Sequence, residues 1–229
     1  ENVGVAVGRN LLLEVAKEDW LLFLDNDIVM ETDNWYDKIL NHIEKEKMAE
    51  VFIPMTFNSH ESRYIEPVYC ELRDEKAIFK PIYKGRTNLF PGGAAFISQQ
   101  LFTRLGCYDQ HFFVGFEDFE LAVRAIKSGN PINAKLIDDI RLIHDHRYVR
   151  AQEDQQAVRI RYNDKLILDS YNRIVSKHNV YLERNFEEWL AKQISQMTNP
   201  TVGASLFQRL YCALRNMLFE IKMKLIVNW

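Results

Sequence analysis

The sequence predicts an α/β protein, because short apolar runs typical of buried strands alternate with amphipathic helical patterns over residues 1–150. Residues 151–229 follow a different pattern, which is mostly helical and breaks at Pro200 and Gly203. We therefore expect an α/β domain over 1–150 and a helical C-terminal extension over 151–229. With 47% hydrophobic and 27% charged residues, the chain has the composition of an ordinary globular protein.

The first predicted elements are a helix and a strand that ends in acidic residues. Residues 8–18 have an apolar face at helical spacing. Residues 20–24, WLLFL, form a continuous apolar run, as expected of a buried parallel strand. The loop that begins with Asp25 and includes Asp27 follows the carboxyl end of this strand, which is where ligands bind in open α/β sheets.

The next segments continue the alternation of helices and strands. Residues 34–47 predict an amphipathic helix, and residues 50–55 predict a second buried strand. Residues 56–90 contain alternating stretches such as RYIEPVYCEL. For this segment we expect antiparallel strands and a long loop.

Two helices that end at glycines and a late strand region complete the domain. Residues 91–109 predict a turn, the strand AAFIS and a helix over 99–105 that ends at Gly106. Residues 117–128 predict a helix that ends at Gly129. The segment AKLIDDIRLIHDH then predicts one or two short strands that end in a pair of histidines.

Charge and cysteine content bear on partners and compartment. The formal net charge of −3 argues against a nucleic-acid partner. Cys70, Cys107 and Cys212 are scattered and odd in number, so we expect buried thiols in a reducing, cytoplasmic compartment. The sequence contains no apolar run of about 18 residues, so we expect no membrane-spanning helix, and no signal peptide opens the chain. The abrupt start at Glu1, without a preceding strand, predicts an N-terminal truncation.

Asp25 and Asp27 are the first candidate site residues. Two carboxylates placed after a buried strand can share a hard divalent cation, and a bound diphosphate can supply further oxygen ligands. Aspartates also favour helix N-caps and turns, which is the structural alternative.

Glu117 and Asp118 are the second candidates. They open a helix directly after the apolar segment HFFVGF, where a partly desolvated carboxylate can act as a general base. Alternatively, the acidic pair only complements the positive end of the helix macrodipole.

A pair of histidines and a pair of glycines complete the candidate set. His144 and His146 share one face of a strand, where either can bind a metal or a phosphate, although a lone histidine is usually structural. We favour His144, because it follows the apolar strand directly. Gly92 and Gly93 let the backbone approach a ligand closely, or they form an ordinary turn between strands.

The order and spacing of these motifs resemble family 2 glycosyltransferases with a GT-A fold. The matching residues are Asn2, Gly4, Arg9 and Asn10, then Asp25 and Asp27, then Gly92, Gly93 and Ala94, then Gly115, Glu117, Asp118, Glu120, Leu121 and Arg124, and finally His144. The resemblance covers residues 1–150. It implies a Rossmann-like nucleotide-diphospho-sugar transferase fold, with a mixed sheet and flanking helices.

The resemblance also implies an activity and its residues. The expected enzyme is inverting and metal-dependent, and it moves a sugar from a nucleotide-diphosphate donor, with UDP-sugars favoured, to a glycan or lipid-linked acceptor in surface polysaccharide synthesis. The implied roles are Asp118 as catalytic base with Glu117 beside it, Asp27 and His144 as ligands of Mn²⁺ or Mg²⁺, and Arg9, Asp25, Gly92 and Gly93 as donor-binding residues.

Two features depart from the family pattern. The strand and helix that open other members, and carry much of the nucleotide pocket, are absent from this sequence, so we expect weaker donor binding and an exposed sheet edge. The QxxRW motif of processive members is incomplete, since Gln156 and Arg159 are followed by Ile160. We therefore expect a non-processive transferase.

Two other functions remain open on the sequence. One is a non-catalytic or degenerate module that binds nucleotide sugars or carbohydrate. Retention of Asp27, Asp118 and His144 together argues against such decay. The other is a sugar nucleotidyltransferase, whose Gly-rich basic loop would lie near an N-terminus that this sequence does not contain.

Residues 204–225 place apolar side chains at helical spacing among basic ones. A helix of this kind can lie on an anionic membrane surface, here the inner face, or it can pack on the domain or on a partner chain. The second role is the more common one for an amphipathic helix.

Overall fold

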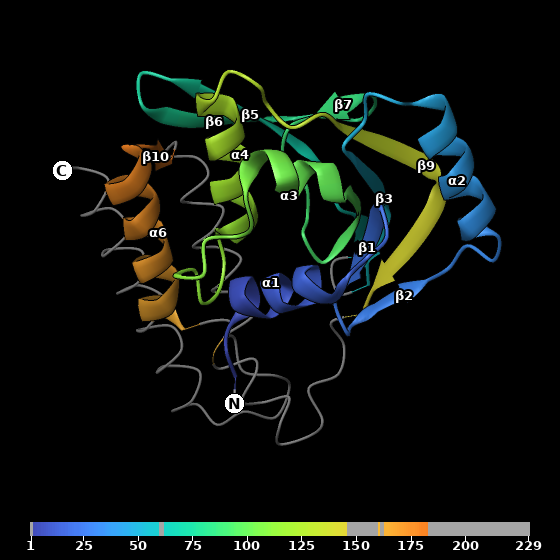
Figure 1. The fold of residues 1–229 in the computed structure, drawn as a ribbon, viewed down its shortest axis with the longest axis horizontal. Helices are drawn as coiled ribbons and strands as arrows, with labels where there is room; N and C mark the ends of the chain where they lie inside the picture. The colour runs from blue at the N-terminus through green and yellow to red at the C-terminus, as the bar shows by residue number, and fades with distance from the viewer. Residues whose placement is uncertain (1, 60–61, 146–159, 161–162, 183–229) are drawn as a thin grey trace.

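The computed structural model describes residues 2–59, 62–145, 160 and 163–182 (Figure 1). The helices are α1 (Val5–Val15), α2 (Trp35–Lys45), α3 (Gln99–Leu105), α4 (Glu117–Lys127) and α6 (Asp164–His178). The strands are β1 (Trp20–Leu24), β2 (Ile28–Met30), β3 (Val51–Asn58), β4 (Arg63–Tyr64), β5 (Val68–Arg73), β6 (Lys76–Pro81), β7 (Arg86–Thr87), β8 (Ala94–Ser98), β9 (Ala134–His144) and β10 (Tyr181–Leu182).

Most strands belong to one mixed sheet. Its order is β1-β8-β3-β9-β2, with β4 paired to β3 and β7 paired to β9. β3 and β9 are parallel, whereas the β1–β8, β3–β8 and β2–β9 pairs are antiparallel. A smaller sheet joins β10, β6 and β5. The predicted α/β class with a mixed sheet and flanking helices is therefore confirmed.

Hydrophobic clusters form on both faces of the main sheet. Because side chains alternate along a strand, Val51 and Ile53 of β3 enter one cluster and Phe52 enters another. The first cluster includes Leu101 of α3 and Leu121 of α4, and α2 contributes to the second. Figure 1 shows α3 and α4 side by side and α2 at the far end of the molecule, beside β9.

The strand predicted over residues 20–24 forms, but its predicted parallel pairing is wrong. β1 pairs antiparallel with β8 along its whole length, and within the described residues it has no second neighbour. Its apolar run has another cause, since Leu21 packs against the first cluster and Leu22 against the second. A continuous apolar run thus reflects coverage of both faces of a strand and does not reveal the direction of its partner.

The other predicted elements before residue 130 also form. Helices occur at each predicted segment, although α1 begins at Val5 and ends at Val15, ahead of the predicted residues 8–18. AAFIS is β8, and Gly106 ends α3 as expected. The segment 56–90 contains antiparallel strands, of which β5 and β6 form a hairpin.

β9 is one strand of 11 residues, where one or two short strands are predicted. Its pairing with β3 is interrupted in the middle, because Pro54 lies opposite Ile137 but Met55 lies opposite Arg141. Pro54 has no N–H to donate to the ladder, so this position tolerates the irregularity. The interruption explains why the sequence pattern resembles two strands.

α6 packs into the same hydrophobic cluster as α4, through fully buried Tyr171 and Ile174. The division of the chain at residue 150 stays a prediction. Several predicted features lie outside the described residues: His146, Gln156, Arg159, Pro200, Gly203, Cys212 and the helix over 204–225. In the part of the chain that the structure describes, no helix is both long and apolar enough to cross a membrane.

The prediction of buried thiols is correct for Cys70 and wrong for Cys107. Cys70 lies in β5 and is 1% exposed, whereas Cys107 is exposed. Cys107 follows Gly106, which ends α3, so it lies in a connecting segment rather than on the apolar face of an element.

Candidate active site

Asp27 and His144 form a pair at the carboxyl end of β9. β2 runs antiparallel to β9 with Ile28 opposite His144, and the N–H of Asp145 donates to the carbonyl of Asp27 at 2.8 Å. This pairing brings the two side chains together, with Nε2 of His144 3.2 Å from Oδ2 of Asp27. The Asp27 side chain is 27% exposed, whereas the His144 side chain is only 11% exposed, so the pair lies mostly buried at the edge of the sheet.

The chemistry of this pair fits a divalent cation. A carboxylate oxygen suits Mg²⁺ and Mn²⁺, and an imidazole nitrogen suits transition metals. Among the described residues, no group of three or more acidic, histidine or cysteine side chains is placed to hold a metal ion. Asp27 and His144 would therefore supply two ligands and leave the remaining positions to diphosphate oxygens and water, as an open catalytic site requires.

A second group of acidic side chains surrounds Arg9 of α1. Its Nη1 atom donates to Oε1 of Glu117 at 3.1 Å and to Oδ1 of Asp118 at 2.9 Å. Its Nη2 atom lies 3.9 Å from Oδ1 of Asp25. The Arg9 side chain is only 10% exposed, so this one guanidinium compensates the charge of carboxylates from two other segments in a largely desolvated place.

The first turn of α4 carries Glu117 and Asp118 toward Arg9. Before it, Gly115 and Phe116 both adopt the left-handed backbone conformation, with φ of 73° and 68°. That conformation is unfavourable for Phe116, whose ring packs against Phe119 and Tyr171 at centroid distances of 6.3 and 6.0 Å. The aromatic packing thus holds the turn that aims the two carboxylates.

Gly92 and Gly93 lie directly against the acidic side chains. The N–H of Gly92 donates to Oδ2 of Asp118 at 2.8 Å, and the N–H of Asp25 donates to the carbonyl of Gly93 at 2.9 Å. A Cβ atom on Gly92 would lie 2.2 Å from Asp118 Oδ1 and Arg9 Nη1, and one on Gly93 would lie 2.2 Å from Asp25 Cγ. Any larger residue would displace these side chains, so both positions require glycine.

Comparison with known proteins identifies the domain. Residues 1–106 match the family model described as Glycosyl transferase family 2. These residues belong to glycosyltransferase family 2. No match was found among curated proteins.

A solved structure of GalNAc-T7 with UDP, GalNAc and Mn²⁺ superposes with a TM-score of 0.51 at 17% identity, and the match covers 93% of this chain and 41% of that one. This likeness shows the GT-A fold, and the chain spans less than half the length of that protein. Two further solved structures are more distant. S. aureus TarS 1-349 in complex with UDP-GlcNAc superposes with a TM-score of 0.46 at 13% identity, and the match covers 86% of this chain and 54% of that one. The mannosyltransferase PcManGT from Pyrobaculum calidifontis in complex with GDP-Man and Mn²⁺ superposes with a TM-score of 0.42 at 12% identity, and the match covers 99% of this chain and 67% of that one.

Burial alters the acidity of the carboxylates beside Arg9. Burial, together with the charge of the neighbouring Asp118, raises the pKa of Glu117 to about 7, whereas Arg9 opposes the change. Burial also raises the pKa of Asp118, against the charge of Arg9 and the hydrogen bond from the N–H of Gly92. The pair therefore holds its negative charge less readily than free carboxylates do, which is a property of general bases poised near neutral pH.

All the predicted site residues fall into these two groups. Asp27 and His144 form one, and the other contains Arg9, the three carboxylates around it, and the two glycines, of which Gly92 lies against Asp118 and Gly93 against Asp25. The stretch from Asp25 to Asp27 connects the groups, since Asp25 faces Arg9 and Asp27 faces His144. The individual catalytic roles stay predictions.

Tyr108 is a site residue that sequence analysis missed. Its ring lies under the guanidinium of Arg9, with Cζ 5.5 Å from the ring centroid, and the residue is 3% exposed. The Asn10 side chain makes two hydrogen bonds to the backbone of Tyr108. Its Nδ2 donates to the Tyr108 carbonyl at 2.8 Å, and its Oδ1 accepts from the Tyr108 N–H at 3.0 Å. A tyrosine in an apolar segment predicts only a core residue, so no sequence signal reveals this contact.

Glu120 and Arg124, which belong to the same motif as Asp118, face a different part of the molecule. Oε2 of Glu120 accepts from Nη2 of Arg124 at 2.8 Å, and Oε1 lies 2.9 Å from both Nζ of Lys177 and Nε2 of His178. Glu120 is fully buried, and although burial opposes ionisation, contacts with His178 and Lys177 lower its pKa to about 2. This network joins α4 to α6 and is structural.

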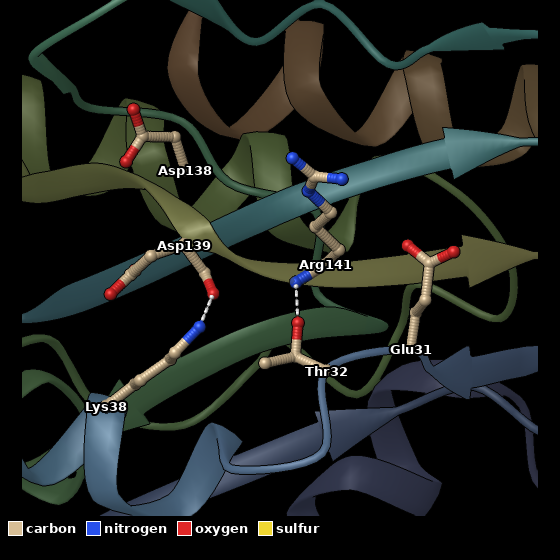
Figure 2. A pocket seen from close by; sticks show the side chains of 6 residues that line it. All are labelled: Glu31, Thr32, Lys38, Asp138, Asp139 and Arg141. Carbon is tan, nitrogen blue, oxygen red and sulfur yellow. Dashed lines mark hydrogen bonds between the residues drawn. The ribbon is translucent and has the colours of Figure 1, made fainter.

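A polar hollow is lined by residues that belong to neither group (Figure 2). It is lined by Glu31, Thr32, Lys38, Asp138, Asp139 and Arg141. Nζ of Lys38 donates to the carbonyl of Asp139 at 2.7 Å, and Oγ1 of Thr32 accepts from the N–H of Arg141 at 2.9 Å, as Figure 2 shows. None of its lining residues is a predicted site residue, so it forms no part of the candidate active site.

Proposed function

We propose that this domain is an inverting, divalent-metal-dependent glycosyltransferase that moves a sugar from a UDP-sugar or related nucleotide-diphosphate donor to a hydroxyl group of a glycan or lipid-linked acceptor. The observation that carries the proposal is the connection between the two groups. Asp25 lies 3.9 Å from Arg9, which binds Asp118, and Asp27 lies 3.2 Å from His144. A metal-bound leaving group and a base for the acceptor can therefore act at one place.

Asp27 and His144 are the proposed protein ligands of Mn²⁺ or Mg²⁺. Because one ligand atom is an imidazole nitrogen, Mn²⁺ is favoured over Mg²⁺. The Mn²⁺ in the GalNAc-T7 structure of the same fold supports this choice. When bound, the ion would supply positive charge that stabilises the departing nucleoside diphosphate.

Asp118 is the proposed base, and Glu117 orients it through the shared contact with Arg9. In a single displacement, the proton of the acceptor hydroxyl passes to Asp118 as the acceptor oxygen forms its bond to the anomeric carbon. The bond from that carbon to the diphosphate oxygen breaks on the opposite side, which inverts the configuration. The two-sided hold on Asp118, from Arg9 and the N–H of Gly92, supports a fixed orientation for this step.

The donor would bind beside Asp25, Gly92 and Gly93, where the two glycines let the carboxylates of Asp118 and Asp25 lie directly against the backbone. Asp25 would contact the ribose or the water shell of the metal. Arg9 already binds two carboxylates, and its contact with the donor diphosphate stays a prediction. We place the reaction in the cytoplasm, at the inner face of the membrane, in the assembly of surface polysaccharide.

The test is release of nucleoside diphosphate from a panel of UDP-, GDP- and dTDP-sugars with Mn²⁺ or Mg²⁺ and a range of acceptors. We expect release to require the metal, and to fall at least about a hundredfold in Asp27→Ala and Asp118→Asn. Glu44→Ala, which changes an exposed acid on α2, is the matched control and should keep full activity. Donor binding without release, equal in wild type and Asp118→Asn, would overturn the proposal in favour of a binding module, and release of pyrophosphate would indicate a nucleotidyltransferase.

A further inference from the structure

We propose that Tyr108 is a positioning residue for Glu117 and Asp118, and that it acts through Arg9. The expected effect on the reaction rate rests on the proposed function, whereas the expected effect on the titration of Glu117 does not. Tyr108 lies in the segment between α3 and α4 and is not one of the motif residues on which the proposed function depends.

The ring of Tyr108 and the two carboxylates hold the same guanidinium. Cζ of Arg9 lies 5.5 Å from the ring centroid, while Nη1 donates to Glu117 at 3.1 Å and Asp118 at 2.9 Å. A cation over an aromatic ring is attracted more strongly when both are shielded from water, and here Tyr108 is 3% exposed and Arg9 is buried. The ring therefore limits the orientations in which Arg9 can meet the carboxylates.

The position of the ring relative to Arg9 is itself fixed. Asn10, the neighbour of Arg9 in α1, makes hydrogen bonds of 2.8 and 3.0 Å to the carbonyl and N–H of Tyr108. Phe102 of α3 packs against the Tyr108 ring at a centroid distance of 5.5 Å. One turn of α1 thus holds both the backbone of Tyr108 and, through Arg9, the carboxylates of α4.

The hydroxyl of Tyr108 adds to this arrangement without exchanging its proton. Burial raises the pKa of Tyr108 well above its usual range, and the negative charge of Asp118 acts in the same direction, so the hydroxyl stays protonated at neutral pH. Besides the charge of Asp118 on Glu117, the main charged or titratable groups that shift the pKa values of the two carboxylates are Arg9 from α1, Asp25 after β1 and, for Asp118, Tyr108 itself. A neutral tyrosine in this set can orient charge but cannot act as the base.

Replacing the ring should loosen Arg9 and so weaken its hold on both carboxylates. The protonated forms then become more favourable, and the pKa of Glu117 should rise by about 0.5 to 1 unit, the size of effect expected for one cation–π contact. Because the base must be ionised, the acidic limb of the pH–rate profile should move to higher pH by a similar amount. The kcat at pH 7 should fall about tenfold with a donor KM changed less than about threefold, because alignment of the base affects the chemical step rather than donor binding.

The experiment compares wild type with Tyr108→Leu, Tyr108→Phe and Phe112→Leu. Tyr108→Phe keeps the ring, and Phe112→Leu removes a fully buried aromatic ring from the same hydrophobic cluster. For each protein, the titration of the Glu117 carboxyl is followed by NMR of carbon-13-labelled glutamate, thermal unfolding is recorded, and metal-dependent nucleoside-diphosphate release is measured from pH 5 to 9.

We expect the Glu117 titration and the pH profile to shift in Tyr108→Leu, to shift by less than half as much in Tyr108→Phe, and to stay unchanged in Phe112→Leu even though that variant is also less stable. Equal titrations in Tyr108→Leu and Phe112→Leu would overturn the inference, since Tyr108 would then be an ordinary core residue. If Tyr108→Leu does not fold, Tyr108→Met takes its place, because methionine fills a similar volume without an aromatic ring, and equal Glu117 titrations in Tyr108→Met and Phe112→Leu overturn the inference. A shifted titration in a protein that releases no nucleoside diphosphate would keep the positioning role and reject the proposed function.

Discussion

Arg9 of α1 and Asp118 of α4 meet at 2.9 Å, between Nη1 of the guanidinium and Oδ1 of the carboxylate. The other oxygen of the same carboxylate accepts from the N–H of Gly92 at 2.8 Å. Asp118 is therefore held from both sides, by a side chain from the start of the chain and by the backbone before β8. This arrangement leads to a prediction about the glycine.

Gly92→Ala should destabilise the protein and impair its activity. Its Cβ atom would lie 2.2 Å from Asp118 Oδ1 and Arg9 Nη1, so both groups must move. We expect a loss of about 1–3 kcal/mol in the free energy of unfolding, from overpacking, and an activity loss of tenfold or more, from misplacement of the base. Urea unfolding and nucleoside-diphosphate release measure the two effects.

Gly8→Ala is the matched control for that change. Gly8 lies within α1, and a Cβ atom there would meet no heavy atom within 4 Å. Alanine in a helix interior should therefore raise the free energy of unfolding by about 0.5–1 kcal/mol. Similar losses in both variants would show that the close approach at Gly92 has no special importance.

His144→Ala should weaken the binding of Mn²⁺ in the presence of UDP by at least about tenfold, because it removes one of the two proposed protein ligands. Isothermal titration calorimetry measures the affinity directly and does not require an acceptor. His42→Ala provides the control, since His42 lies on α2 with Nε2 2.7 Å from Oδ1 of Asp139. Equal Mn²⁺ affinities in the His144 variant and wild type would exclude His144 as a ligand.

The free energy of unfolding should fall as the pH rises through the titration of Glu117. Burial raises the pKa of Glu117 to about 7, so between the ordinary pKa of a glutamate and about pH 7 the folded state binds a proton that the unfolded state has released. The free energy of unfolding therefore decreases over that range, by an amount on the order of 2–3 kcal/mol. Glu117→Gln should remove this part of the pH dependence in urea unfolding measured from pH 4 to 8, and an unchanged slope would contradict the assignment.

Glu120 should have the opposite dependence on pH. Its pKa is lowered to about 2 by its contacts with His178 and Lys177, although burial opposes this. Its stabilising contribution is complete above the ordinary pKa of a glutamate and disappears as the pH falls toward 2. At pH 7, Glu120→Gln should cost roughly 3 kcal/mol, because it removes the buried carboxylate that compensates the partly buried charges of Arg124 and Lys177. Glu44→Gln on the exposed side of α2 should change stability by less than about 0.5 kcal/mol, and a similarly small effect at Glu120 would refute the structural role of the network.

The existence of the helices and most strands could be predicted, because local periodicity reports which faces are covered. Ile39 of α2 is buried as its spacing predicts, and Ser98 caps α3 by accepting the N–H of Gln100 at 3.2 Å. The direction of β1 could not be predicted in this way. Its side chains pack on both faces of the sheet whichever way its partner runs, and only the pairing with β8 decides the direction.

The sequence by itself determined which residue types are available to the site: an acidic pair after β1, another at the start of α4, paired glycines and a late histidine. Only the tertiary structure decided how they are used. It set Arg9 among carboxylates, placed Tyr108 under its guanidinium, and turned Glu120 away from Asp118 toward α6. The physical reason is that sequence spacing governs contacts within one helix or strand, whereas the charge balance of a buried carboxylate depends on elements far apart in the chain.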